Sequence, residues 1–311
     1  NHLAPFPPNK IFLSYYVVGL IHKCKGKKMN KSILGTSILA FLAISACNDT
    51  DKNSEDKVEE QCVTTQCIED DNQKSIEQIY NEVINNKNND LVDSIYTVDF
   101  IHHNSAIGAT TTGQKSHFTS LVTNNPDHVA NIKHIVADGE YVAVHWHYSD
   151  TPDNEFSGAI KSDLYKLNDG LVVEQWNVSM ALGDSTVSGN SAFSDLYVYD
   201  NTAAVMSDTK EEENKTMVTE FYLDLFNTGD VSLVDEFVDI NYLQHNVWVP
   251  NGSEALSNYV SSITPGGLEI FLTLAEGDMV WTFVGTDNLS VVDLWRVNYN
   301  DGKIVEHWDL F

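Results

Sequence analysis

His307 and Asp309, near the C-terminus, have the residue types and the spacing that proton transfer requires. Both lie in residues 300–311, where an Asp-Gly turn leads into a run typical of a strand. Alternation puts Val305, His307 and Asp309 on one strand face, with His307 and Asp309 about 7 Å apart. A carboxylate in an apolar cavity has a raised pKa, so Asp309 can remove a proton beside a carbonyl, and His307 or His245 could steady the enolate oxygen. The alternative is that Asp309 is exposed and His307 only packs.

A fainter copy of this stretch occupies residues 168–178, where Gln175 and Asn177 replace His307 and Asp309. Neither amide side chain can act as a proton-shuttling base at neutral pH. The first copy is therefore either catalytically inactive, with Asn177 lining a ligand pocket, or it uses other groups.

Histidines are concentrated in the first copy, where His145 and His147 flank a tryptophan on a predicted strand and so share a face. Together with His103 and Asp163 they offer a plausible ligand set for a divalent metal. Two histidines at this spacing without a fixed third ligand are a weak signal. The favoured interpretation is that His103, His145 and His147 line a polar pocket, and no metal is assigned.

Most of the chain beyond residue 73 consists of two related units. An apolar face with helical spacing, an apolar-apolar-acidic triplet and a His-Asn pair each recur 142 residues later. The matching sets are Ile76, Ile79, Tyr80, Val83 and Ile84 with Val218, Phe221, Tyr222, Leu225 and Phe226; Leu91-Val92-Asp93 with Leu233-Val234-Asp235; and His103-Asn104 with His245-Asn246.

Each unit begins with helices and continues with about four strands in hairpin order. Ser75 and Gln78 have the spacing of a capping box at the start of the first helix. Helices followed by antiparallel strands predict an α+β fold with helices covering a curved sheet. The expected domains are residues 74–182 and 214–311, with a linker at 183–213 that packs in part on a domain.

Three short stretches carry a resemblance: "YLQHN", "AEGDMV" and "DGKIVEHWD", all in the second unit. With the opening helix, each unit resembles the SnoaL-like branch of the nuclear transport factor two superfamily. The resemblance implies two tandem cones, each with a mouth for a small, mostly apolar or carbonyl-containing molecule, and no cofactor. It also implies pairing through the sheets, as an internal pseudo-dimer or a homodimer. Because the superfamily hosts many functions on one fold, it indicates a reaction only weakly.

The resemblance suggests roles for residues on several elements. Polyketide cyclases of this kind use an acidic pocket residue, which we carry over to Asp309. Tyr80 and Tyr222 lie on the inward helix face, either as core residues or, as in some relatives, as oxyanion donors. The His-Asn pairs, which include Asn246, are equally compatible with a structural role and with a pocket.

Residues 1–73 suggest that the protein is exported. Residues 1–28 precede Met29 and are interpreted as an upstream mis-start, and residues 29–46 have the order of a lipoprotein signal peptide, with Cys47 as the lipidated residue. Asn48 favours the outer membrane, facing the periplasm or the cell surface. Residues 47–73 are acidic and polar and are expected to be a flexible tether, in which Cys62 and Cys67 could form a disulfide.

Charge and missing motifs exclude several classes. The net charge of -27 disfavours binding to nucleic acid. The sequence lacks a nucleophile elbow, a Walker A loop and a dinucleotide-binding glycine motif. We expect cyclase-type aldol condensation or isomerase-type proton transfer on a small carbonyl compound in the second unit. The alternative is a non-catalytic ligand-binding lipoprotein, with or without a metal in the first unit.

Overall fold

The computed structural model describes residues 64–199, 206–285 and 289–311. The predicted signal peptide, Cys47 and most of the predicted tether, including Cys62, lie outside these ranges. Cys67 is disulfide-bonded. Across the described ranges, no helix has both the length and the apolar character needed to cross a membrane.

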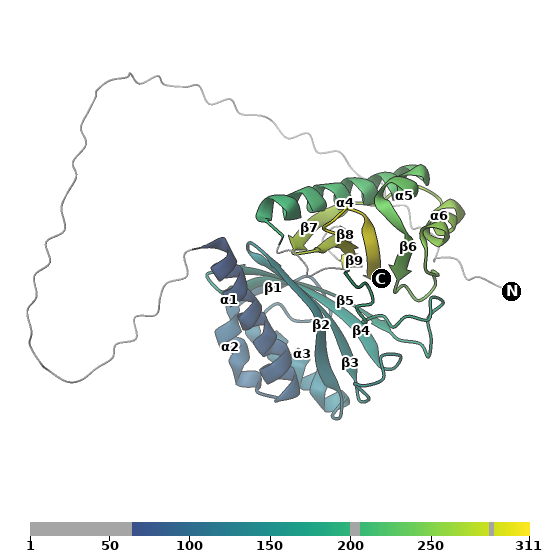
Figure 1. Ribbon diagram of the computed structural model, residues 1–311. Coiled ribbons are helices and arrows are strands. Elements are labelled where there is room, and N and C mark those ends of the chain that lie inside the picture. The colour runs from purple at the N-terminus through teal and green to yellow at the C-terminus, as the bar shows by residue number, and fades with distance from the viewer. Residues whose placement is uncertain (1–63, 200–205, 286–288) are drawn as a thin grey trace, which may run out of the picture. The chain divides into compact units, whose positions relative to one another are not determined.

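The first domain places helices on one face of a five-stranded sheet (Figure 1). Strand order is β1-β5-β4-β3-β2; β1 runs parallel to β5, and the other neighbours are antiparallel. The elements are α1 (Thr65–Gln78), η1 (Ile79–Asn85, a π-helix), η2 (Asn89–Leu91), α2 (Val92–Ile95), β1 (Tyr96–His102), α3 (Thr111–Asn124), β2 (Val129–Asp138), β3 (Tyr141–Ser149), β4 (Ala159–Asn168) and β5 (Leu171–Ala181).

The second domain repeats this arrangement with strand order β6-β10-β9-β8-β7. Its first strand, β6, is again parallel to its last, β10. The elements are α4 (Asp208–Thr228), α5 (Ser232–Phe237), β6 (Val238–Gln244), α6 (Ser253–Ser262), β7 (Ile270–Glu276), β8 (Met279–Gly285), β9 (Leu289–Val297) and β10 (Ile304–Leu310). The predicted α+β class with two tandem domains is confirmed. Each sheet has five strands rather than four, because β1 and β6 lie among the helices in sequence.

The first helix begins earlier than predicted. Thr64 caps α1 by accepting a hydrogen bond from the Cys67 amide, so Ser75 lies inside the helix and caps nothing. The Asn72 amide donates to the carbonyl of Gly139, which anchors the helix to the β2–β3 turn. The end of the predicted tether is therefore helical, because its polar residues bond to the domain instead of water.

The predicted linker is also more ordered than its composition suggests. Phe193 is buried in a small apolar cluster with Ile160, Ala192 and Leu310. α4 starts at Asp208, with Ser207 as its N-cap, so the last residues assigned to the linker belong to the second domain.

The two sheets contact each other through their outer faces. Side chains from both domains form one buried apolar cluster, which contains Trp176 of the first domain and Trp281 and Trp308 of the second. Each domain's helix-covered face holds a separate core. A residue on any central strand therefore points either toward its own helices or toward the other domain.

Candidate active site

Three side chains converge on the helix-covered face of the second sheet: Asp293 from β9, and His307 and Asp309 from β10. Asp293 lies directly opposite Asp309 in the antiparallel register. His307 Nε2 is 3.1 Å from Asp293 Oδ1. One ligand atom from each of the three residues lies within 4.8 Å of the others. The sequence therefore brings two carboxylates and an imidazole to one buried point.

A shift in the strand pairing aims these residues inward. The register of β10 changes between Ile304 and Glu306 against both neighbouring strands. Ile304, His307 and Asp309 consequently share the helix-covered side, and Ile304 belongs to that core. Simple alternation from His307 and Asp309 would place Ile304 on the opposite face, and the register shift instead puts Ile304 on the same side as the pair.

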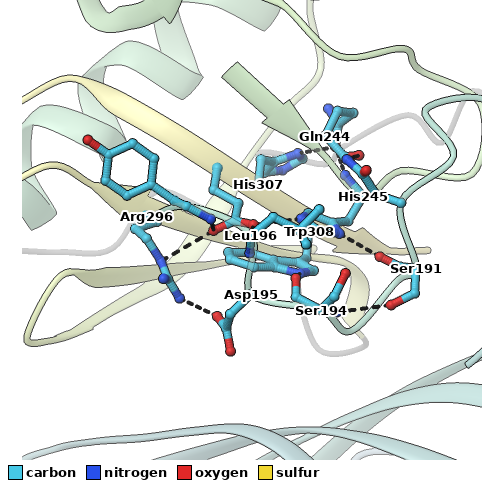
Figure 2. A network of polar contacts seen from close by, with 12 residues as sticks. Ser191, Ser194, Asp195, Leu196, Gln244, His245, Arg296, His307 and Trp308 are labelled. Carbon is cyan, nitrogen blue, oxygen red and sulfur yellow. Dashed lines mark hydrogen bonds and ion pairs between the residues drawn. The ribbon is translucent and has the colours of Figure 1, made fainter. Parts of the chain in front are cut away.

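Gln244 determines which nitrogen of His307 carries a proton. Its Oε1 accepts hydrogen bonds from the backbone amides of His245 and Asn246, both at 2.9 Å. Gln244 Oε1 is also 3.0 Å from His307 Nδ1, a contact that is drawn in Figure 2. Because this oxygen only accepts, Nδ1 must be the protonated nitrogen. A neutral His307 then faces Asp293 with an acceptor, so the intervening proton belongs to Asp293.

The electrostatics of the pocket favour that arrangement. Burial raises the pKa of Asp293 to about 7 and lowers the pKa of His307 to about 4. Burial raises the pKa of Asp309 to about 6. His307 opposes this shift, and the charge of Asp293 adds to it. At neutral pH, Asp309 is the more readily ionised carboxyl and Asp293 the better proton donor.

Neighbouring groups orient the two carboxyls. Asn246 donates to Asp309 Oδ2 at 2.6 Å, and the hydroxyl of Tyr222 lies against Asp293. Trp295 packs on His307 with ring centroids 4.0 Å apart. Asp293 Oδ2 and Asp309 Oδ1 are buried without a hydrogen-bond partner among the described residues. One oxygen of each carboxyl therefore keeps an unused hydrogen-bonding capacity within the described part of the chain.

His245 does not join this group, contrary to the prediction. It lies on the other face of the sheet, where its Nε2 is 2.9 Å from Glu306 and its ring stacks on Trp308 at 4.7 Å. Its Nδ1 contacts the carbonyl oxygen of Ser191 in the interdomain segment (Figure 2). Consecutive residues at the end of β6 point to opposite faces, so Gln244 enters the pocket and His245 is excluded from it.

In the first domain, Asp163 occupies the position of Asp293, and neighbouring side chains donate hydrogen bonds to it. Asp163 accepts hydrogen bonds from Trp146 at 2.6 Å, from Gln175 at 3.1 Å and from Tyr80 at 3.1 Å. Tyr80 is also 3.0 Å from Tyr165, so it lies in the polar centre of the first core. Both oxygens of Asp163 are occupied. In the first domain Gln175 replaces His307, so no hydrogen bond there shares a proton between a carboxyl group and an imidazole as Asp293 and His307 do.

The family comparison covers the first of these domains. Residues 74–183 match the family of SnoaL-like polyketide cyclases. This segment is a SnoaL-like domain. None of the curated proteins matches the sequence.

Several solved structures are similar to part of the chain. The putative polyketide cyclase IdmH from Streptomyces antibioticus is 19% identical, over 35% of this chain and 91% of its own, with a TM-score of 0.30. A putative SnoaL-like polyketide cyclase from a Jannaschia species is 19% identical, over 36% and 87%, with a TM-score of 0.32. TsrD from Streptomyces laurentii is 14% identical, over 35% and 88%, with a TM-score of 0.31.

The predicted histidine pocket and metal alternative of the SnoaL-like domain are not supported. Trp146 points to the helices, so His145 and His147 point away from them, toward Phe193. His145 is paired with His134, and His147 with the carbonyl of Ser157. Among the described residues, the grouping with metal-like spacing is Asp293, His307 and Asp309 instead.

His103 also lies outside the pocket of the SnoaL-like domain. It contacts Glu174 at 2.9 Å and stacks on Trp176 at 4.1 Å, as His245 does on Glu306 and Trp308. The shared histidine therefore belongs to the outer face in both domains. Asn104 behaves differently: it turns inward and donates to Asn177 at 3.0 Å, as Asn246 does to Asp309.

Sequence reasoning missed Asp293 and Gln244 as site residues. The signal for Asp293 was present, because Asp163-Leu164-Tyr165 aligns with Asp293-Leu294-Trp295. No local pattern marks Gln244, whose role depends on two backbone amides of the following turn.

Proposed function

We propose that the second domain is also SnoaL-like and that it catalyses cofactor-independent proton transfer on a small carbonyl compound. The observation that carries the proposal is the opposed pair of Asp293 and Asp309, whose pKa values are raised to about 7 and about 6. Two titratable groups with separated pKa values next to each other are the usual basis for an acid and a base in one site.

In the proposed reaction Asp309 is the base and Asp293 the acid. The ionised Asp309 removes a proton from the carbon beside the carbonyl, and Asp293 donates its proton to the carbonyl oxygen as the enol forms. The Tyr222 hydroxyl is hydrogen-bonded to Asp293 and stabilises the negative charge that Asp293 acquires when it gives up its proton. The enol then attacks a second carbonyl of the same molecule, as in a cyclisation, or regains a proton at another carbon, as in an isomerisation.

His307 holds a proton in place instead of removing one from substrate. Its Nδ1–H is fixed by Gln244, and its free Nε2 lone pair receives the hydrogen bond from Asp293. The lowered pKa of His307 keeps the ring neutral near pH 7. His307 is therefore a positioning residue for the acid.

Exchange of α-protons tests this half-reaction without knowledge of the natural substrate. A panel of small ketones and 1,3-dicarbonyl compounds is incubated with the full chain in D₂O and followed by NMR. We expect exchange to be fastest between about pH 6 and 7, where Asp309 is ionised and Asp293 protonated.

Two variants are compared with the unmodified protein in that assay. Asp309→Asn is expected to lower exchange by roughly 10²-fold or more, while Asp224→Asn, an exposed carboxylate in the same domain, leaves it unchanged. Equal exchange by Asp309→Asn and the unmodified protein would refute Asp309 as the base. Saturable binding of a panel compound without exchange would favour the non-catalytic ligand-binding function.

We also propose that the mature protein is a lipoprotein attached through Cys47, with the two domains outside the inner membrane. The support is the basic, apolar and small-residue order of residues 29–47. Labelling with a fatty-acid analogue in a bacterial host should depend on Cys47 and be lost in Cys47→Ala.

A further inference from the structure

In the SnoaL-like domain, a lysine side chain lies in the wall of a small cavity. Lys161 on β4 lines a cavity of about 20 Å³ beneath the helices, together with His117, Trp146 and Asp163. The space is about that of one water molecule, so it holds little more than the reacting carbonyl group itself. Lys161 Nζ lies 5.4 Å from the centre of the Trp146 ring.

Lys161 differs in its partners from Lys133 and Lys166, the lysines that lie on its own sheet. Lys166, on the same strand, lies 3.5 Å from Glu140 and 3.6 Å from Glu174, and Lys133 is paired with Glu155 at 2.6 Å. For Lys161, by contrast, no ion pair is found within the described part of the chain, and the nearby Asp163 is engaged by three donors. Burial accordingly lowers the pKa of Lys161, and the charge of Asp163 opposes the shift only in part.

The second domain lacks this amine. Asp163 and Asp293 occupy equivalent positions, so the register pairs Lys161 and Trp146 with Val291 and Val284. The first copy thus has a lysine over an indole where the second copy has two valines. It has this lysine although it lacks the opposed carboxyl pair of the second domain.

We propose that Lys161 is a nucleophilic residue that forms a reversible Schiff base with small aldehydes or ketones entering this cavity. The nitrogen lone pair attacks the carbonyl carbon, and a proton is transferred to the oxygen to give a carbinolamine. Loss of water then leaves a C=N bond between the former carbonyl carbon and Nζ. The step releases one water per imine and requires no oxidant or reductant.

His117 on α3 is placed to move the protons of this step. It lines the same cavity, and burial followed by the nearby Lys161 charge lowers its pKa, which keeps the imidazole neutral. A neutral imidazole can take the proton from nitrogen and return it to the departing hydroxyl. The Trp146 ring, 5.4 Å from Nζ, favours the charged amine, so the lowered pKa of Lys161 comes from its burial in the cavity wall.

Reductive trapping tests the proposal on the full, unmodified chain. The protein is incubated at pH 7 with limiting propionaldehyde and sodium cyanoborohydride, and the propylated lysines are located by peptide mass spectrometry. We expect Lys161 to be modified several-fold faster than Lys166, because burial lowers the pKa of Lys161 whereas the pKa of Lys166 is raised. Modification of Lys161 no faster than Lys166 would overturn the proposal, and this comparison needs no variant.

Variants then separate this activity from that of the second domain. Lys161→Arg should remove the fast modification and Lys166→Arg should retain it, with folding checked by circular dichroism. In the unmodified chain, exchange of ketone α-protons without fast modification of Lys161 would refute this proposal alone. Fast modification of Lys161 without exchange would refute the proposal for the second domain alone.

Discussion

At the scale of single residues, the protonation of the second-domain site depends on a few fixed contacts. Gln244 Oε1 receives two backbone amides and therefore cannot donate to His307. The same contacts make His307 Nε2 an acceptor for Asp293. An ordinary glutamine next to the site thus determines which of the three titratable groups carries the acidic proton.

We expect Gln244→Met to destabilise the protein by about 1–3 kcal/mol, because it leaves buried amides and His307 Nδ1 without an acceptor. The unmodified protein should show His307 as the neutral tautomer protonated at Nδ1 in long-range ¹H–¹⁵N spectra near pH 7. A spectrum with the proton on Nε2 would contradict the assignment of the acid.

The raised pKa of Asp293 also predicts how stability depends on pH. Its folded pKa of about 7 exceeds the unfolded value of about 3.9. The unfolded state therefore binds fewer protons between these values, and the free energy of unfolding falls as pH rises from about 4 to 7. His307, with its lowered pKa, acts in the opposite direction below about pH 6.5, so the comparison must be with a variant.

Asp293→Asn should remove that contribution. We expect the slope of unfolding free energy against pH to become less negative by up to about 1.4 kcal/mol per pH unit between pH 4 and 7. Urea titrations at several pH values measure this slope, and Asp224→Asn should leave it as it is. An unaltered slope in Asp293→Asn would mean that this carboxyl titrates normally.

At the scale of elements, β10 serves two faces at once. His307 and Asp309 point to the helices, whereas Glu306 and Trp308 point to the other domain. Glu306 is fully buried and accepts from the backbone amides of Leu196 and Tyr197. Arg296 contacts both Glu306 and Asp195, and Figure 2 shows its contact with Asp195. The strand that carries the candidate base is thus held from behind by the interdomain segment.

Gly113 in α3 permits a close approach that another residue would prevent. A Cβ at this position would lie 2.4 Å from the carbonyl oxygen of Gly108. We therefore expect Gly113→Ala to lower the free energy of unfolding by about 1–3 kcal/mol. Gly183→Ala is the control, because the nearest atom to its Cβ would be 3.9 Å away. Similar denaturation midpoints for the two variants would show that the loop beside α3 yields easily.

At the scale of the whole molecule, the two domains make reciprocal contacts. Glu276 accepts a hydrogen bond from the Ala137 amide at 2.8 Å, and Asp138 accepts one from the Ala275 amide at 3.0 Å. The corresponding turns of the two copies therefore exchange equivalent bonds, as expected for related subunits about a two-fold axis. This reciprocity supports the proposal that the duplication supplies an internal pseudo-dimer.

Trp281 tests how far the domains depend on each other. It is fully buried in the cluster shared by both sheets. We expect Trp281→Ala to cost about 3–5 kcal/mol and to split one calorimetric transition into two. Trp248→Ala removes a tryptophan that is 59% exposed and should do neither. A single transition in Trp281→Ala, shifted no more than in Trp248→Ala, would show that this contact does not couple the domains.

The sequence by itself determined the number of domains, their class and the pairing of His307 with Asp309. These follow from local periodicity and from a repeated pattern, which the chain carries along its length. The 142-residue offset even extends to Glu69 and Glu211, each of which accepts from the glycine amide of its own domain's turn. Including this match in the repeat would have placed the predicted start of the first helix upstream of Glu69, closer to its observed start at Thr65.

Which of the repeated groups contact each other depends on the tertiary fold. His103 and His245 recur at equivalent positions, yet both lie on the outer face, while Gln244 lies inside. Asp293 becomes a candidate acid because a register shift and burial place it against Asp309 without a counter-ion. Burial, and therefore pKa, is set by atoms distant in sequence, so residue types and spacing alone could not assign the acid or the base.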